Sequence, residues 1–172
     1  MANKKTILGA DVVKFDNGQD GFNPVFRKTI DILADGVVNG NYYAIARLPR
    51  GFAPRNAAVA VLEDLAESNS NVTVAVAIGT ASDEDGVVDD VTVLAASGTN
   101  HKAGTIAIAS LVAGSGTVES TTATVSLAPV VANGTDAAPV YIWVAVGSGV
   151  VKGKLEVTVS GDQMLTPSKA GV

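Results

Sequence analysis

Apolar and polar residues alternate in short runs along most of the chain. Val and Ile occupy every second position from Val72 to Ile78, with Thr or Ala between them. This period of two predicts a strand whose two faces differ in character. Residues 25–33 alternate in the same way and place Phe26, Ile30 and Ile32 on one face. Clusters of Gly, Pro, Asn and Asp separate the runs and predict turns between strands.

The expected strands share this β-branched or alternating composition. They are residues 25–33, 42–48, 56–65, 72–78, 87–95, 104–112, 117–127, 140–146 and 150–159. Residues 56–65 also fit a helix, because Val59, Leu62 and Leu65 lie at helical spacing behind a possible Asn56 cap. We interpret this segment as a strand. Since no helical patterns separate the strands, the sequence predicts an all-β fold, an antiparallel two-sheet sandwich that is jelly-roll-like.

Three regions follow from the same pattern. Residues 1–24 hold no regular period for long and form an extended N-terminal arm, residues 25–160 form the β-sandwich domain, and residues 161–172 form a C-terminal tail. Phe15 and Phe22 are large apolar residues spaced along the arm. An arm of this kind packs either on its own domain or on a neighbouring molecule.

Composition narrows the chemistry. The 172 residues are long enough for one proper hydrophobic core, and the absence of cysteine excludes disulfides, thiol nucleophiles and iron–sulfur clusters. Lys and Arg number 12 against 17 Asp and Glu, so the net charge is −5. Nucleic-acid binding depends on clustered basic residues, and we therefore expect no nucleic-acid partner.

The chain is apolar overall but shows no targeting or membrane segment. The mean hydropathy is +0.32 and 47% of residues are hydrophobic. The apolar residues are spread in short pieces, without the run of about 18 that a transmembrane helix needs. The N-terminal residues lack a secretory apolar stretch. We expect a protein with no membrane partner and no cleaved signal.

Several strands are apolar on both faces. Tyr141 and Trp143 alternate with Val and Ile between residues 140 and 146, and alanines alternate with Ile106 and Ile108. An antiparallel sheet that faces water is usually polar on its outer side. Tyr and Trp are frequent interface anchors, and alanine faces allow close approach. This predicts that an outer face, formed by such residues, is covered by another subunit, a partner or the arm.

Residues with catalytic or metal-binding chemistry are sparse. His101 is the single histidine and lies in a Thr-Asn-His-Lys segment that predicts an exposed loop, with no nucleophile motif nearby. We expect no enzyme and no cofactor. Asp83, Asp85 and Asp89 lie around a loop bent at Gly86 that could bind calcium. The EF-hand spacing is absent, however, and a solvated hairpin loop is the favoured interpretation.

Arg47, Arg50 and Arg55 form the one basic cluster of this acidic chain. Arginine suits bidentate contact with carboxylates, so the cluster is a candidate docking site for an acidic partner. Ordinary loop charges are the alternative interpretation.

The order of these elements resembles a known family. A strand ends in the run from Arg47 to Phe52, an alternating strand leads into the run from Val76 to Asp85, and a strand from Lys154 to Val159 closes the domain. Over residues 25–160 this resembles the capsid decoration (cement) proteins of tailed bacteriophages, which are β-sandwich virion proteins.

The resemblance implies a non-enzymatic structural protein on the capsid exterior of the virion. The partners it implies are the major capsid protein and further copies of the chain itself, as a trimer. It also implies that the protein is made in the cytoplasm of the bacterial host. The implied contact residues are Phe15, Phe22, Arg47, Arg50, Arg55, Tyr141 and Trp143. A tail, neck or fibre component and a carbohydrate-binding jelly-roll module remain the alternatives.

Overall fold

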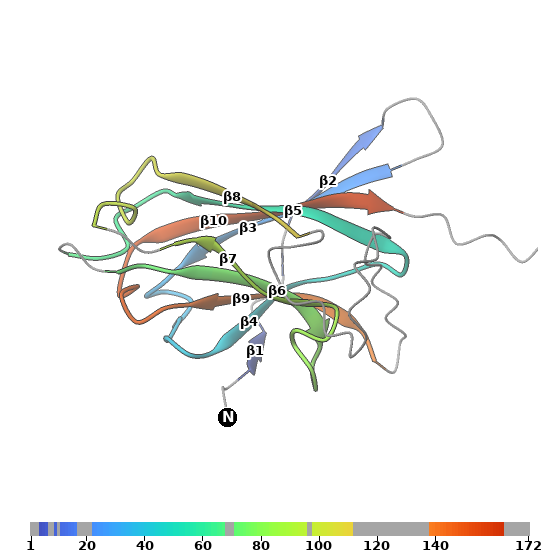
Figure 1. Ribbon diagram of the computed structural model, residues 1–172, viewed down its shortest axis with the longest axis horizontal. Helices are drawn as coiled ribbons and strands as arrows, with labels where there is room; N and C mark the ends of the chain where they lie inside the picture. Colours follow the sequence, from blue (N-terminus) through green and yellow to red (C-terminus); the bar gives the residue numbers. More distant parts are fainter. Residues whose placement is uncertain are drawn as a thin grey trace, which may run out of the picture.

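The computed structural model describes residues 4–6, 9, 11–16, 22–67, 71–95, 98–111 and 138–163. These residues form ten strands in two sheets (Figure 1). The strands are β1 (Lys4–Thr6), β2 (Asp11–Asp16), β3 (Phe22–Asp31), β4 (Tyr42–Arg47), β5 (Phe52–Val61), β6 (Val74–Thr80), β7 (Val88–Leu94), β8 (Ile106–Ser110), β9 (Val140–Val146) and β10 (Lys154–Gln163). Across the described ranges, no helix is long and apolar enough to cross a membrane.

The eight strands from β3 to β10 form an antiparallel sandwich. One sheet has the order β4-β9-β6-β7 and the other has the order β3-β10-β5-β8, with neighbouring strands antiparallel in both. Successive strands change sheet except for β6 and β7, which are neighbours in one sheet, and this order is that of a jelly roll. The predicted all-β, two-sheet, jelly-roll-like fold is therefore confirmed.

The predicted arm adds one strand to an edge of each sheet. β1 pairs with β4 in parallel, and β2 pairs with β3 antiparallel, with Asp11 opposite Arg27 and Asp16 opposite Phe22. Within this chain the arm thus pairs with its own domain. Two predicted region boundaries fall inside strands, because β3 begins at Phe22 and β10 continues to Gln163.

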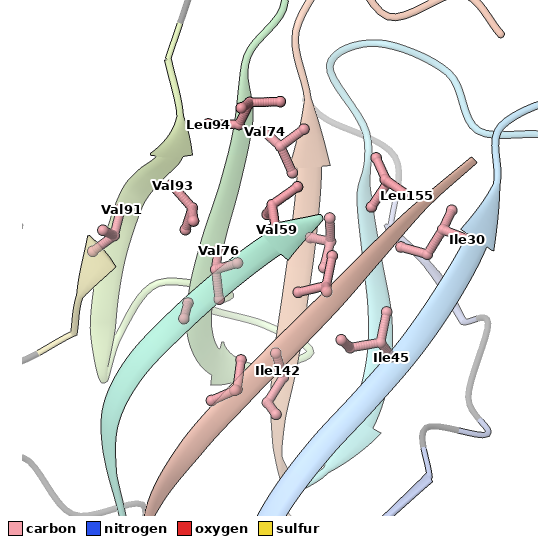
Figure 2. Packing of buried hydrophobic residues seen from close by; sticks show 14 of the residues in the cluster. Ile30, Ile45, Val59, Val74, Val76, Val91, Val93, Leu94, Ile142 and Leu155 are labelled. Atoms are coloured by element: carbon pink, nitrogen blue, oxygen red, sulfur yellow. The ribbon is translucent and has the colours of Figure 1, made fainter. Parts of the chain in front are cut away.

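The hydrophobic core lies between the sheets. Val74, Val76 and Ile78 of β6 point inward toward Leu155 and Val59 of the opposite sheet, as Figure 2 shows for most of these residues. All five side chains are fully buried. The strict alternation of residues 72–78 correctly predicted this inward row, because one face of the strand packs against the other sheet.

The ambiguous segment at residues 56–65 is a strand as far as Val61, and residues 62–65 lie beyond the strand. β5 starts at Phe52, earlier than predicted, and contains Pro54. Proline has no N–H for a ladder bond and is tolerated at irregular positions. Here it pairs with Gly161, where the register of β10 shifts between Ser160 and Gly161. The predicted strand at residues 117–127 lies outside the described residues.

Candidate interaction surfaces

A small apolar cluster lies on the outer face of the β4-β9-β6 sheet. Ala44, Trp143 and Ala77 are in register on three adjacent strands, and Tyr42 and Tyr141 pack against them. We call these five residues the aromatic cluster. The Tyr141 and Trp143 rings meet edge to face, with centroids 5.5 Å apart and planes at 63°.

Trp143 is already covered within this chain. Its side chain lies between two alanines, and only 2% of the residue is exposed. The indole Nε1 donates a hydrogen bond of 3.0 Å to the carbonyl oxygen of Gly79. Tyr141 is only half-buried. Contact of Tyr141 and Trp143 with another subunit therefore stays a prediction, in which Tyr141 offers the accessible surface.

The acidic loop between β6 and β7 folds back over the same sheet. A side chain at Gly79 would collide with the backbone of Asp83 and Glu84, including the Glu84 carbonyl oxygen at 2.6 Å. The absent side chain therefore lets the loop lie directly on the strand. Burial and a hydrogen bond with Asp83 raise the pKa of Asp85.

The candidate calcium residues do not assemble a metal site in the described part of the chain. No group of three or more His, Asp or Glu residues there is placed to hold a metal ion. Asp83 is exposed, whereas Asp85 and Asp89 are partly buried. Asp89 accepts a 2.8 Å hydrogen bond from the backbone N–H of Asp90. The loop geometry is thus that of a turn held by local hydrogen bonds.

Tyr42 links distant strands of the sheet. Its hydroxyl donates a hydrogen bond to Asp90 on β7. Partial burial raises the pKa of Asp90, and nearby Asp89 and Glu84 act in the same direction, while the Tyr42 bond lowers it. Burial and the carboxylate of Asp90 also raise the pKa of Tyr42. The neutral phenol is therefore the donor, and the hydrogen bond favours the charged form of the Asp90 carboxylate.

Replacing Tyr42 with phenylalanine is expected to raise the pKa of Asp90 further, because the bond that favours the charged form is lost. At pH 7 the free energy of unfolding should fall by about 1 kcal/mol, a modest value because Asp90 is partly solvated. NMR titration of the Asp90 carboxyl and urea denaturation would measure both effects.

The matched control is Tyr141→Phe. The hydroxyl that this variant removes makes no hydrogen bond within the described ranges. A raised carboxyl pKa stabilises the fold at low pH, and this contribution is lost as pH rises from 3.8 through the raised value. The extra destabilisation of Tyr42→Phe should therefore be absent well below pH 3.8. An equal loss at pH 2 and pH 7 would contradict the assigned hydrogen bond.

The three arginines of the basic cluster lie on different parts of the sandwich. Arg47 ends β4 in one sheet, Arg50 lies in the following turn, and Arg55 lies in β5 of the other sheet. All three are exposed. Arg55 forms an ion pair with Asp162 at 2.5 Å. Arg50 is therefore a stronger candidate than Arg55 for contact with an acidic partner, and the contact role of Arg47 stays a prediction.

The arm phenylalanines lie in paired strands. Phe15 of β2 is opposite Asn23, and Phe22 opens β3 opposite Asp16. Their role in contacts with a partner remains a prediction.

His101 is buried, which corrects the prediction of an exposed loop. The residue has no exposed surface, and neither ring nitrogen has a hydrogen-bond partner. Backbone bonds tie this loop to the segment after β5: Leu65 N–H donates to His101 O at 2.9 Å, and Ala103 N–H donates to Asp64. A serine-type relay needs partners on both ring nitrogens, and His101 has none on either nitrogen in the described part of the chain.

Sequence reasoning missed the exposed isoleucines of β8. Ile106 and Ile108 are 69% and 71% exposed, whereas Ala107 and Ala109 pack against the core. The alanines were expected on the outer side, opposite a row of buried isoleucines. The small residues face inward at the sheet edge where β8 approaches β7 of the other sheet. The only signal in the sequence was that both faces of this strand are apolar.

Two solved phage structures resemble this chain. One is described as the cyanophage Pam1 capsid asymmetric unit, with 16% identity, coverage of 90% of this chain and 94% of that chain, and a TM-score of 0.47. The other is described as the capsid of Ralstonia phage GP4, with 17% identity, coverage of 94% and 99%, and a TM-score of 0.48. No protein-family model and no curated protein matches the chain.

Proposed function

We propose that this chain is a non-enzymatic structural protein of a tailed-phage virion, and that it binds the outer capsid surface as a decoration protein. The descriptions of the two similar solved structures both name a phage capsid, and the proposal places this chain in a phage capsid as well. The observation that carries the proposal is the aromatic cluster on an outer sheet face. The sequence resemblance over residues 25–160 supports the same function.

An outer face of this kind suits contact rather than chemistry. Antiparallel sheets that face water are usually polar on the outside, yet here Tyr42 and Tyr141 border buried Ala and Trp residues. Half-buried tyrosines supply large contact area at low entropic cost, and they are frequent at interfaces. In the described part of the chain, no carboxylates or histidine gather into a metal or relay arrangement. A binding surface explains these features better than an active site.

The contacts of the proposed complex follow from the exposed candidates. Tyr141 and Arg50 would touch the major capsid protein or a second copy, with Arg47, the arm phenylalanines and Trp143 nearby or behind them. Copies would associate as a homo-oligomer, and a trimer follows from the resemblance. Binding only to the assembled shell stabilises that shell by mass action. Many identical sites then strengthen a modest affinity through avidity.

Copy number in purified particles tests this function most directly. Quantitative mass spectrometry of virions from the source should find this chain in amounts comparable to the major capsid protein. A few copies to a few tens would overturn the decoration role in favour of a tail, neck or fibre component. Absence from particles would overturn the virion assignment altogether.

Charge reversal at Arg50 tests the contact surface. Arg50→Glu should lower the occupancy of this protein on stripped capsids about tenfold or more, because an exposed cation would become repulsive toward an acidic partner. Lys152→Glu is the matched control. Lys152 precedes the start of β10, which pairs with the end of β5, whereas Arg50 precedes the start of β5. Lys152 pairs only weakly with Glu67, at 3.5 Å. Both variants should keep the parental thermal melt. Equal occupancy of the two variants would remove Arg50 from the interface.

A further inference from the structure

The outer face of the second sheet carries an exposed apolar strip. Ile108 lies opposite Ala58, and Ile106 lies opposite Ala60, so the four side chains share one face. Leu62 continues the same face beyond β5 and is 47% exposed. We call these five residues the apolar strip. It ends at β8, which is the last strand of its sheet in the described part of the chain.

The backbone of β8 is oriented to accept another strand. Val61 N–H donates to Thr105 O, and Leu111 N–H donates to Arg55 O, both at 2.8 Å. Ladder bonds in antiparallel pairs alternate, so Ala107 and Ala109 bond toward β5, as do the Thr105 C=O and the Leu111 N–H. The N–H and C=O groups of Ile106 and Ile108 therefore point away from β5, toward the open side of the sheet.

The strand lacks the features that normally protect a sheet edge. Between Ile106 and Ala109 there is no charge and no proline, and the pairing with β5 shows no register shift. The edge strand β7 of the other sheet does have such protection. It carries Asp89 and Asp90, and its pairing with β6 shows two register shifts. Charges and bulges are the usual means of blocking edge-to-edge pairing. Of the β7 and β8 edges, β8 is therefore the one suited to edge-to-edge pairing.

We propose that β8 pairs antiparallel with β8 of a second copy, around a two-fold axis at Ala107. In this register Ile106 lies opposite Ile108 of the second copy, and Ile108 lies opposite its Ile106. Both pairs use the outward-pointing N–H and C=O groups, and the four isoleucines meet on one face. The two sheets then become one continuous sheet across the copies.

Charge favours a second copy over a charged partner. Ionised groups around the strip are already paired within the chain: Lys102 with Asp64 and Lys154 with Glu63, each at 2.8 Å, and Glu156, which lies opposite Ala60, with Arg27 at 3.7 Å. The strip therefore offers an uncharged surface that matches another uncharged strand. The net charge of −5 on each copy opposes association, and salt screens this repulsion. Association should accordingly strengthen with ionic strength.

The contact is small, and the expected affinity of the dimer is therefore low. One pair of short strands buries less than the ~1,000 Å² typical of a stable interface, so the dimer forms at high protein concentration or when copies are held close together. This inference stands on the β8 edge alone and does not depend on the capsid role.

Register-specific disulfide trapping tests the pairing. The chain has no cysteine, so Ile106→Cys and Ile108→Cys each introduce a single thiol. Opposed residues of a bonded antiparallel pair lie ~5.5 Å apart at Cα, within the range of a disulfide. After mild oxidation of an equimolar mixture, with one variant labelled with nitrogen-15, mass spectrometry should find mostly mixed dimers. Random encounters would give as many like pairs as mixed pairs and would overturn the register.

Two controls complete the test. Leu33→Cys places a thiol at a residue that is 72% exposed and outside the strip, and it should give no enrichment of mixed dimers with Ile106→Cys. Sedimentation of the parental chain up to millimolar concentration should show dimers, and Ile108→Lys should abolish them while keeping the parental melt. A parental chain that stays monomeric throughout, at low and high salt, would overturn the proposal even if capsid binding is intact.

Discussion

Replacing Phe52 with alanine is expected to lower the free energy of unfolding by about 3–5 kcal/mol, the range for loss of a buried aromatic side chain. Phe52 is fully buried at the start of β5. Its ring meets Phe26 of β3 edge to face, with centroids 5.2 Å apart and planes at 82°. It also lies against Gly161 of β10, where an added side chain would come within 2.6 Å of the ring. Three strands of one sheet therefore depend on this one side chain.

Urea denaturation followed by circular dichroism measures this loss. The expected value lies within the total stability of ordinary domains, about 5–15 kcal/mol, so the variant should still fold at low temperature. Leu33→Ala removes an apolar side chain that is mostly exposed, and should change the stability by less than about 0.5 kcal/mol. A loss below about 1 kcal/mol for Phe52→Ala would contradict the packing described.

A double-mutant cycle separates the ring contact from simple burial. Phe26→Leu and Phe52→Leu each keep an apolar side chain while removing the ring. Because the two residues touch, their effects should not add, and the coupling should be about 0.5–1.5 kcal/mol. Strict additivity would mean that the two rings contribute independently.

Alternation predicted most of the strands because it reports directly on burial. In β6 the Val and Ile row faces the other sheet, and the opposite row of small residues faces outward, as the period of two requires. The jelly-roll class followed from many strands without helices between them. The pairing of strands far apart in sequence, such as β3 with β10, depends on contacts that no local pattern encodes.

Where both faces of a strand are apolar, alternation cannot identify the inner face. In β8 the isoleucines were as suited to the core as the alanines, and the proximity of β7 decided in favour of the smaller residues. His101 illustrates a second limit. Its polar neighbours predicted exposure, but backbone hydrogen bonds from the segment after β5 hold the loop with the imidazole buried.

The sequence identified which residues the candidate surfaces contain, but it did not predict where these residues lie in the fold. Tyr141 and Trp143 were correctly set apart as outer-face aromatics, because they alternate with the inward row of β9. The bond between Tyr42 and Asp90 joins residues 48 positions apart and required the folded sheet. The three arginines are close in sequence, yet the chain crosses from one sheet to the other between Arg47 and Arg55.

Gly79→Ala is expected to destabilise the fold by about 3 kcal/mol, at the upper end of the usual range for overpacking. The added methyl group would overlap the backbone of Asp83 and Glu84, and neither group is the flexible end of a side chain. The acidic loop would therefore have to move away from β6. The same residue accepts the indole hydrogen bond of Trp143, so the aromatic cluster should loosen together with the loop.

Tryptophan fluorescence reports this coupling directly, because Trp143 is the only tryptophan in the chain. The buried indole should emit at short wavelength in the parental protein and at longer wavelength in Gly79→Ala. Gly40→Ala is the control: its added methyl group meets no atom within 4 Å, but its φ of +78° is unfavourable for alanine. That variant should lose about 1–2 kcal/mol with no change in emission. If both variants lose the same stability and keep the parental emission, the loop does not rest on Gly79, and the aromatic cluster does not depend on it.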